Sequence, residues 1–129
     1  MKRNEFLALA LLGLAGAGTA LSLAGSQAGQ DIPENVRAVF RKHCVRCHTG
    51  PKPPKGLSFI PGKIAAVIDA PSAEDPSKKI VDSEAPESSY LLKKVRREGG
   101  FTGKPMPPRR ALTADELLVL EAWIAGLNK

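Results

Sequence analysis

Residues 44–48 place two cysteines and a histidine close together, as Cys44, Cys47 and His48. Thiols three positions apart lie on one face of a helical turn, so both can bond to a single flat partner. A histidine directly after the second thiol is then forced against that partner, where its imidazole can bind a metal. This Cys-x-x-Cys-His pattern is the attachment signature of a c-type haem. The motif therefore predicts one covalently attached haem c per chain, with His48 as an axial iron ligand.

Other uses of two cysteines explain the pattern less well. A structural zinc site commonly takes four ligands from two separated pairs, and this chain has no second cysteine pair. A redox-active Cys-x-x-Cys lies in a βαβ setting, and neither flank of the motif has a strand pattern. A disulfide between Cys44 and Cys47 accounts for both cysteines but leaves His48 without a role.

The beginning of the chain has the pattern of an export signal. A positive start precedes an uncharged stretch, residues 6–25, and a small-residue cleavage site at residues 26–28. We predict a signal peptide over residues 1–28 and one domain over residues 29–129, located in the periplasm. The alternative is an uncleaved anchor that holds the domain on the periplasmic face of the inner membrane, because twenty uncharged residues can span a bilayer.

The predicted domain is small and basic. It has about a hundred residues, and five of them are aromatic, so its own apolar core would be modest. A haem would form the centre of such a core, and we expect the protein without haem to be largely unfolded. From Gly29 onward, 17 Lys and Arg face 12 Asp and Glu, a formal charge of +5. Because the basic residues form no long run, we expect no nucleic acid partner. This positive charge either helps the protein to dock on an acidic surface of a redox partner or only aids its solubility.

Three segments have helical patterns. The first helix runs into the cysteine motif, and the second begins around Pro86 and ends at a glycine pair, residues 99–100. The third starts with a capping box, in which Thr113 is the N-cap and Glu116 follows three residues later. The residues at helical spacing are Val36, Val39 and Phe40; then Tyr90, Leu91, Lys94 and Val95; then Leu117, Leu120, Ile124 and Leu127.

Long loops join these helices. Residues 49–62 are rich in proline and glycine and cannot continue a helix, so we expect this loop to cover the His48 side of the haem. Residues 64–68 are too short a run to decide between helix and strand. Residues 70–85 are polar and are predicted to be a surface loop. The apolar side chains that we expect against the haem are Leu57, Phe59 and Ile60, with Phe40 near its edge.

Met106 is the candidate for the second axial ligand, because the other methionine is Met1. Prolines before and after Met106 stiffen its loop, since proline restricts its own backbone and that of the preceding residue. Such a loop could hold a neutral thioether against iron, and methionine ligation raises the reduction potential relative to two histidines. The alternative is that Met106 fills a gap in the core.

The two histidines have different predicted roles. A backbone carbonyl of the loop over residues 49–62, for example that of Pro53 or Pro54, is expected to accept the second ring N–H of His48 and so to fix its tautomer. The sequence does not show which carbonyl it is. His43 directly precedes Cys44. The chain would have to double back to bring this residue to the opposite side of the haem, so we expect a surface or rim position for it.

These features together resemble the class I, mitochondrial-like c-type cytochromes and the small bacterial cytochrome c domains. The likeness rests on the early Cys-x-x-Cys-His, on Met106-Pro107-Pro108 and on the closing helix through Trp123. It covers roughly residues 33–128 and departs from the family in the proline-rich region 50–85. The resemblance implies an all-α fold, a small cytochrome c fold of three main helices and long loops around one covalent haem. It also implies His48 and Met106 as the axial ligands.

The sequence favours an electron-transfer protein over an enzyme. Both cysteines are used by the haem, and ligation by His48 and Met106 leaves the iron no open site for a substrate. We expect a one-electron carrier, or a permanent cytochrome subunit of a dehydrogenase or oxidase complex. A five-coordinate haem enzyme or gas binder is a third alternative. We expect a monomer or a complex subunit, which contacts a membrane only if its N-terminal segment is retained. Basic residues that could form a rim at the haem edge are Lys52, Lys55, Lys104, Arg109 and Arg110.

Overall fold

A computed structural model of the chain describes residues 31–128, so the predicted signal peptide lies outside the described residues. Within this range the regular structure is helical, with no strand beyond two isolated bridges, and the predicted all-α class is confirmed for it. None of these helices is both long and apolar enough to cross a membrane. The elements are α1 (Glu34–His43), η1 (Pro54–Gly56), η2 (Pro61–Val67), η3 (Pro86–Ser88), α2 (Tyr90–Arg96) and α3 (Ala114–Ala125), the η elements being 3-10 helices.

Helix α1 begins after Pro33 and buries the residues that its spacing predicted. Val36, Val39 and Phe40 face the core, and Ile32 is buried just before the helix. The first turn carries an acidic residue and the last turn three basic ones, as the helix dipole favours. The helix ends at Cys44, so the cysteine motif occupies the turns that follow α1 rather than the helix itself.

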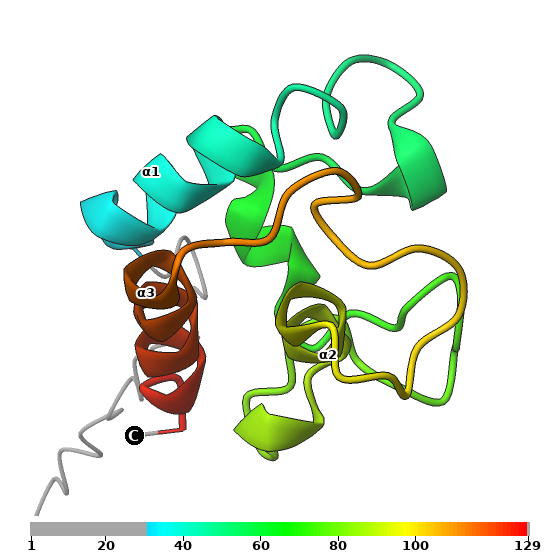
Figure 1. The fold of residues 1–129 in the computed structure, drawn as a ribbon, viewed down its shortest axis with the longest axis vertical. Coiled ribbons are helices and arrows are strands. Elements are labelled where there is room, and N and C mark those ends of the chain that lie inside the picture. Colours follow the sequence, from blue (N-terminus) through cyan, green and yellow to red (C-terminus); the bar gives the residue numbers. More distant parts are fainter. Residues whose placement is uncertain (1–30, 129) are drawn as a thin grey trace, which may run out of the picture.

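Helix α3 packs beside α1, with the loop from α2 crossing to its start (Figure 1). The predicted capping box is confirmed. Thr113 Oγ1 accepts a hydrogen bond from the Glu116 amide at 3.2 Å, and the Glu116 carboxylate accepts one from the Thr113 amide at 3.0 Å. The buried face of α3 consists of Leu120, Trp123 and Ile124.

An aromatic cluster joins α1, the following loop and α3. The rings of Phe40 and Phe59 stack with centroids 4.9 Å apart, and Trp123 meets Phe40 edge-on at 5.9 Å. Phe40 is completely buried. The cluster therefore fixes the loop after the cysteine motif against both terminal helices.

Helix α2 differs from its prediction at both ends. The chain from Pro86 first forms the short η3, and α2 starts at Tyr90. It ends at Arg96 rather than at the glycine pair, because Arg97 already takes the left-handed conformation, with φ 63°. A left-handed residue at this point stops the helix as a glycine would.

The segment between η2 and η3 is more buried than predicted. Residues 64–68 lie mostly in the 3-10 helix η2, which answers the open choice between helix and strand. The prediction of a surface loop over residues 70–85 was wrong for Ile80 and Val81, which are buried. The Ile80 amide donates to the Ala70 carbonyl at 2.8 Å, so the loop folds back on itself and inserts these two side chains. A pair of apolar residues in a charged stretch is too short to show a periodicity.

Candidate functional site

The four predicted haem-binding residues line one cavity. Cys44, Cys47 and His48 reach it from the end of α1, and Met106 reaches it from the loop between α2 and α3. The cavity has a volume of about 250 Å³. Most of its other walls are apolar: Leu57, Phe59, Ile80, Leu91, Val95, Pro107 and Pro108. Residues some sixty positions apart in the chain thus meet around one apolar space. Figure 1 shows the loop that carries Met106 in orange, between α2 and α3.

The two cysteines are free thiols, not a disulfide. Cys44 is half-buried and Cys47 is exposed. Burial raises the pKa of the Cys44 thiol to about 12, and the neighbouring Cys47 adds to the effect. Burial therefore disfavours the thiolate form of Cys44 in this structure. Residues 31–128 contain no cluster of three or more His, Cys, Asp or Glu able to hold a metal ion.

His48 is buried, and its ring is held on two sides. Its Nδ1 lies 3.1 Å from the Leu57 carbonyl oxygen, and the Phe59 ring meets it edge-on at 5.2 Å. The Phe59 amide also donates to the His48 carbonyl at 3.0 Å. When Nδ1 donates to Leu57, the proton is on that nitrogen and Nε2 keeps its lone pair for a metal.

The carbonyl that contacts His48 belongs to the predicted loop, but it is that of Leu57 rather than that of Pro53 or Pro54. The carbonyls of Pro53 and Pro54 accept from the amides of Gly56 and Leu57, at 3.0 and 3.1 Å, and so are used within the 3-10 turn η1. Lys55 and Gly56 have positive φ angles of 55° and 69°, which turn the chain. The turn brings the Leu57 carbonyl to the histidine instead.

The predicted apolar contacts are partly corrected. Leu57 and Phe59 line the cavity, as expected, but Ile60 and Phe40 do not. Phe40 lies in the core behind Phe59, on which it stacks. Phe40 lies four residues before Cys44, on the expected face of α1. The ring that reaches the cavity is that of Phe59, from the loop after the cysteine motif.

Met106 is half-buried, and its backbone is tied to α2. Its amide donates to the Lys94 carbonyl at 3.1 Å. The Met106–Pro107 peptide bond is cis. The guanidinium of Arg97 donates to the Pro107 carbonyl just after it. The loop is therefore held to α2 on both sides of the thioether.

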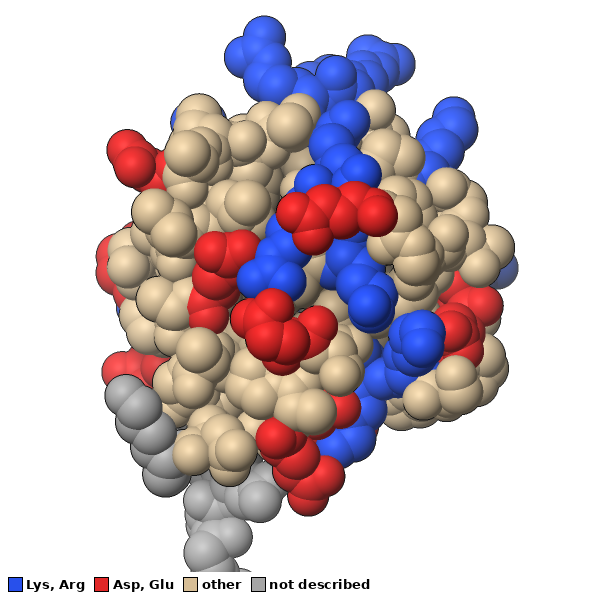
Figure 2. Space-filling view, turned by 60° about the horizontal axis from the view of Figure 1, so that its bottom comes forward, with Lys and Arg blue, Asp and Glu red and all other residues tan. Residues whose placement is uncertain are grey.

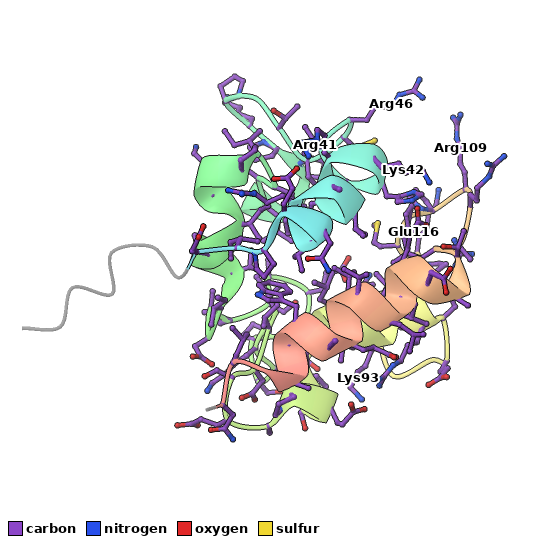
Figure 3. All side chains as sticks on the ribbon, turned by 90° about the vertical axis from the view of Figure 1, so that its left-hand side faces the viewer. Arg41, Lys42, Arg46, Lys93, Arg109 and Glu116 are labelled. Carbon is purple, nitrogen blue, oxygen red and sulfur yellow. The ribbon has the colours of Figure 1, made fainter. Side chains whose placement is uncertain are left out.

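His43 is among the residues that line the cavity, and its side chain faces Glu116 of α3. Its Nε2 is 2.9 Å from a carboxylate oxygen of Glu116, although the angle does not make a hydrogen bond. Lys42 pairs with the other oxygen of Glu116 at 2.6 Å. In Figure 3, Lys42 and Glu116 lie in the gap between these two helices. With 12% of its side chain exposed, His43 is more buried than the surface or rim position that we expected.

The cavity wall also contains polar residues that were not predicted as site residues, among them Glu74, Tyr90 and Lys94. The last two were placed on one helix face, and a lysine on an apolar face is a signal of a buried charge. Glu74 gave no such signal, because it lies in a run of charged and polar residues.

The predicted basic rim consists of exposed side chains. Lys52, Lys104, Arg109 and Arg110 are exposed and make no ion pair within residues 31–128, whereas Lys55 lies 4.0 Å from Glu74. Arg46, inside the cysteine motif, is also exposed, and Figure 3 shows it projecting from the same side as Arg109. On the face shown in Figure 2, acidic and basic side chains alternate.

Support for a function comes from the residues that line the cavity and from the cysteine motif. Comparison of the chain with protein-family models, with curated proteins and with solved structures found no match.

Proposed function

We propose that this protein is a mono-haem c-type cytochrome with a small cytochrome c fold, which carries single electrons. One observation carries the proposal: two free thiols, a buried imidazole and a thioether line the same apolar cavity. Haem c uses these four groups, two for covalent attachment and two for the iron. The proposal joins the cysteine motif to a methionine that lies far from it in the sequence.

The donor set fits a haem better than a bare ion. The imidazole of His48 and the thioether of Met106 are neutral and relatively soft, which suits iron in a porphyrin. Aromatic and aliphatic walls suit a flat, apolar macrocycle, with Leu57 and Phe59 excluding water on the side of His48.

Each residue has a distinct task in this proposal. Cys44 and Cys47 would hold the haem, His48 would bind the iron in the orientation set by Leu57, and Met106 would close the opposite side. The bound haem supplies a one-electron ferric–ferrous couple, and the methionine ligand raises its potential. Cys47 is exposed, so the edge bonded to it would lie near solvent, where a partner can approach.

The proposed partners are redox proteins with acidic docking surfaces. Arg46, inside the cysteine motif, and Arg109 project into solvent from the same side of the molecule, and such charges accelerate encounters with an acidic surface. The export pattern at the start of the chain supports a periplasmic location. A free carrier and a subunit of a larger complex would use the same site.

The experiment that tests the proposal is expression in a host that matures c-type haem, followed by intact mass and absorption spectra. We expect the mass of one haem per chain, retained in acidified organic solvent. The ferric protein should show the weak long-wavelength charge-transfer band of a methionine-ligated iron. Met106→Leu, which keeps the side-chain volume, should abolish that band while the haem stays attached.

The two histidines give a matched control. His43→Ala should keep both the covalent haem and the charge-transfer band, whereas His48→Ala should lose normal iron ligation. A wild-type protein that releases its haem in acidified solvent would contradict covalent attachment. A charge-transfer band that survives in Met106→Leu would contradict the assignment of the second ligand.

A further inference from the structure

Lys94 is a buried lysine in the cavity wall, with its ammonium group fully occupied. It is 5% exposed. Its Nζ lies 2.5 Å from a carboxylate oxygen of Glu74. The same nitrogen donates to the carbonyls of Thr102 and Lys104, at 2.5 and 3.0 Å. A buried ammonium is tolerated when it is paired and hydrogen-bonded in this way.

Three hydrogen bonds of Lys94 converge on the segment that leads to Met106. The ammonium of Lys94 donates to the carbonyls of residues 102 and 104. The backbone carbonyl of Lys94 accepts a hydrogen bond from the Met106 amide at 3.1 Å. One residue of α2 thus fixes three points within five residues of the loop.

Glu74 and Tyr90 complete the arrangement. The Tyr90 hydroxyl donates to Glu74 at 3.1 Å and accepts from the Thr102 amide at 2.8 Å. Burial opposes the ionisation of Glu74, but hydrogen bonds from Lys94 and Tyr90 outweigh it and lower the pKa of the carboxyl. Gly103 has a φ of 73°, and a Cβ there would lie 3.2 Å from Glu74, so the loop passes directly against this carboxylate.

We infer that Lys94, with Glu74 and Tyr90, is a positioning residue that holds the loop so that Met106 can bind the iron. The inference rests on the proposed function. None of the three needs to touch the iron, because they act through the backbone of residues 102–106. Their loss should loosen the methionine and leave the attachment through the cysteines unchanged.

Competition for the iron by added imidazole measures this role in the haem-loaded protein. A loosened methionine is displaced more easily, so the apparent affinity for imidazole rises. Lys94→Met should lower the apparent Kd of the ferric protein for imidazole by about tenfold or more, since hydrogen bonds from a charged group are lost. The charge-transfer band should weaken in parallel. Lys93→Met is the matched control, because Lys93 makes no ion pair within residues 31–128, and it should leave both readouts unchanged.

A double variant separates positioning from stability. Glu74→Gln with Lys94→Met leaves no unpaired buried charge, so it should recover much of the unfolding free energy that Lys94→Met loses. The imidazole affinity should stay raised, because the carbonyls of Thr102 and Lys104 still lack their donor. If stability and affinity return to wild type together, the role is structural and the inference is overturned.

The remaining outcomes are also decisive. If Lys94→Met does not fold, Tyr90→Phe replaces it, with an expected decrease of about threefold in the Kd for imidazole. If the measured variant binds imidazole with wild-type affinity, this inference is overturned but the proposed function is not. A wild-type protein that lacks the charge-transfer band and binds imidazole as tightly as Met106→Leu overturns the proposed ligation, and the inference with it.

Discussion

Removing the charge of Glu116 should weaken the packing of α3 against α1 and change how the stability of the protein depends on pH. The carboxylate of Glu116 accepts from the Thr113 amide and lies 2.6 Å from Lys42 and 2.9 Å from His43. The interactions with Lys42 first, then with His43 and the Thr113 amide, lower the pKa of the Glu116 carboxyl from 4.5 to about 2. Glu116→Gln keeps the capping hydrogen bond but removes the charge.

The expected loss at pH 7 is about 1.5 kcal/mol of unfolding free energy. The ion pair with Lys42 contributes about 0.5–1 kcal/mol, because the lysine side chain is 65% exposed. The negative charge at the start of α3 contributes about 0.5 kcal/mol more through the helix dipole. The lowered pKa sets a ceiling of about 3 kcal/mol by linkage, which solvent screening at Lys42 reduces.

The pH dependence has a definite sign. A carboxyl with a lowered pKa in the folded state stabilises the protein above its unfolded pKa, and this contribution is lost as the pH falls through the folded pKa. The stability difference between wild type and Glu116→Gln should therefore be full above about pH 5 and nearly absent at about pH 2. Other carboxylates titrate in both proteins and cancel in the comparison.

Chemical unfolding followed by circular dichroism, at a series of pH values, measures this difference. Asp115→Asn is the matched control, since it removes a first-turn charge that has no ion pair within residues 31–128. It should cost about 0.5 kcal/mol or less. A wild-type stability for Glu116→Gln at pH 7, or a difference that does not change down to about pH 2, would refute the assignment of stability to this charge.

Two further substitutions test the core and the methionine loop. Phe40→Ala should lower the unfolding free energy by about 3–5 kcal/mol in chemical unfolding, because it empties the centre of the aromatic cluster. Leu118→Ala should lower it by about 0.5 kcal/mol or less. Equal losses would mean that the cluster is not the core. Leu118 is 60% exposed, which makes it a suitable reference. Gly103→Ala should destabilise by about 1–2 kcal/mol, from its left-handed backbone and the contact with Glu74. Gly99 has φ 87° and no atom near an added Cβ, so Gly99→Ala should show the cost of the left-handed backbone alone. An equal loss in both variants would exclude a contribution from the contact between residue 103 and Glu74.

Local patterns in the sequence predicted the helices well. The spacing of Val36, Val39 and Phe40 and the capping box of Thr113 and Glu116 depend on neighbours three or four residues away. Such short-range patterns keep their meaning in the folded chain. The end of α2 was missed because Arg97, which is not a glycine, adopts the left-handed conformation.

The details of the site depend on distant contacts, which a local pattern does not contain. The carbonyl of Leu57 reaches His48 through two successive residues with positive φ, one of which is Lys55. Glu74 enters the cavity because Ile80 and Val81 fold their segment inward. The sequence predicted the four groups proposed to bind haem from their chemistry, but it did not predict the polar contacts that hold them.

The burial of Ile32 limits the reach of the domain if the N-terminal segment is retained. This side chain is 5% exposed, and α1 follows two residues later. The uncharged stretch that could span the membrane is residues 6–25, so residues 26–31 would connect it to Ile32, and six residues extend at most about 20 Å. An anchored domain would stay against the bilayer surface with few orientations, and its partners would have to approach along the membrane. A processed chain would instead diffuse freely and could shuttle between separate complexes.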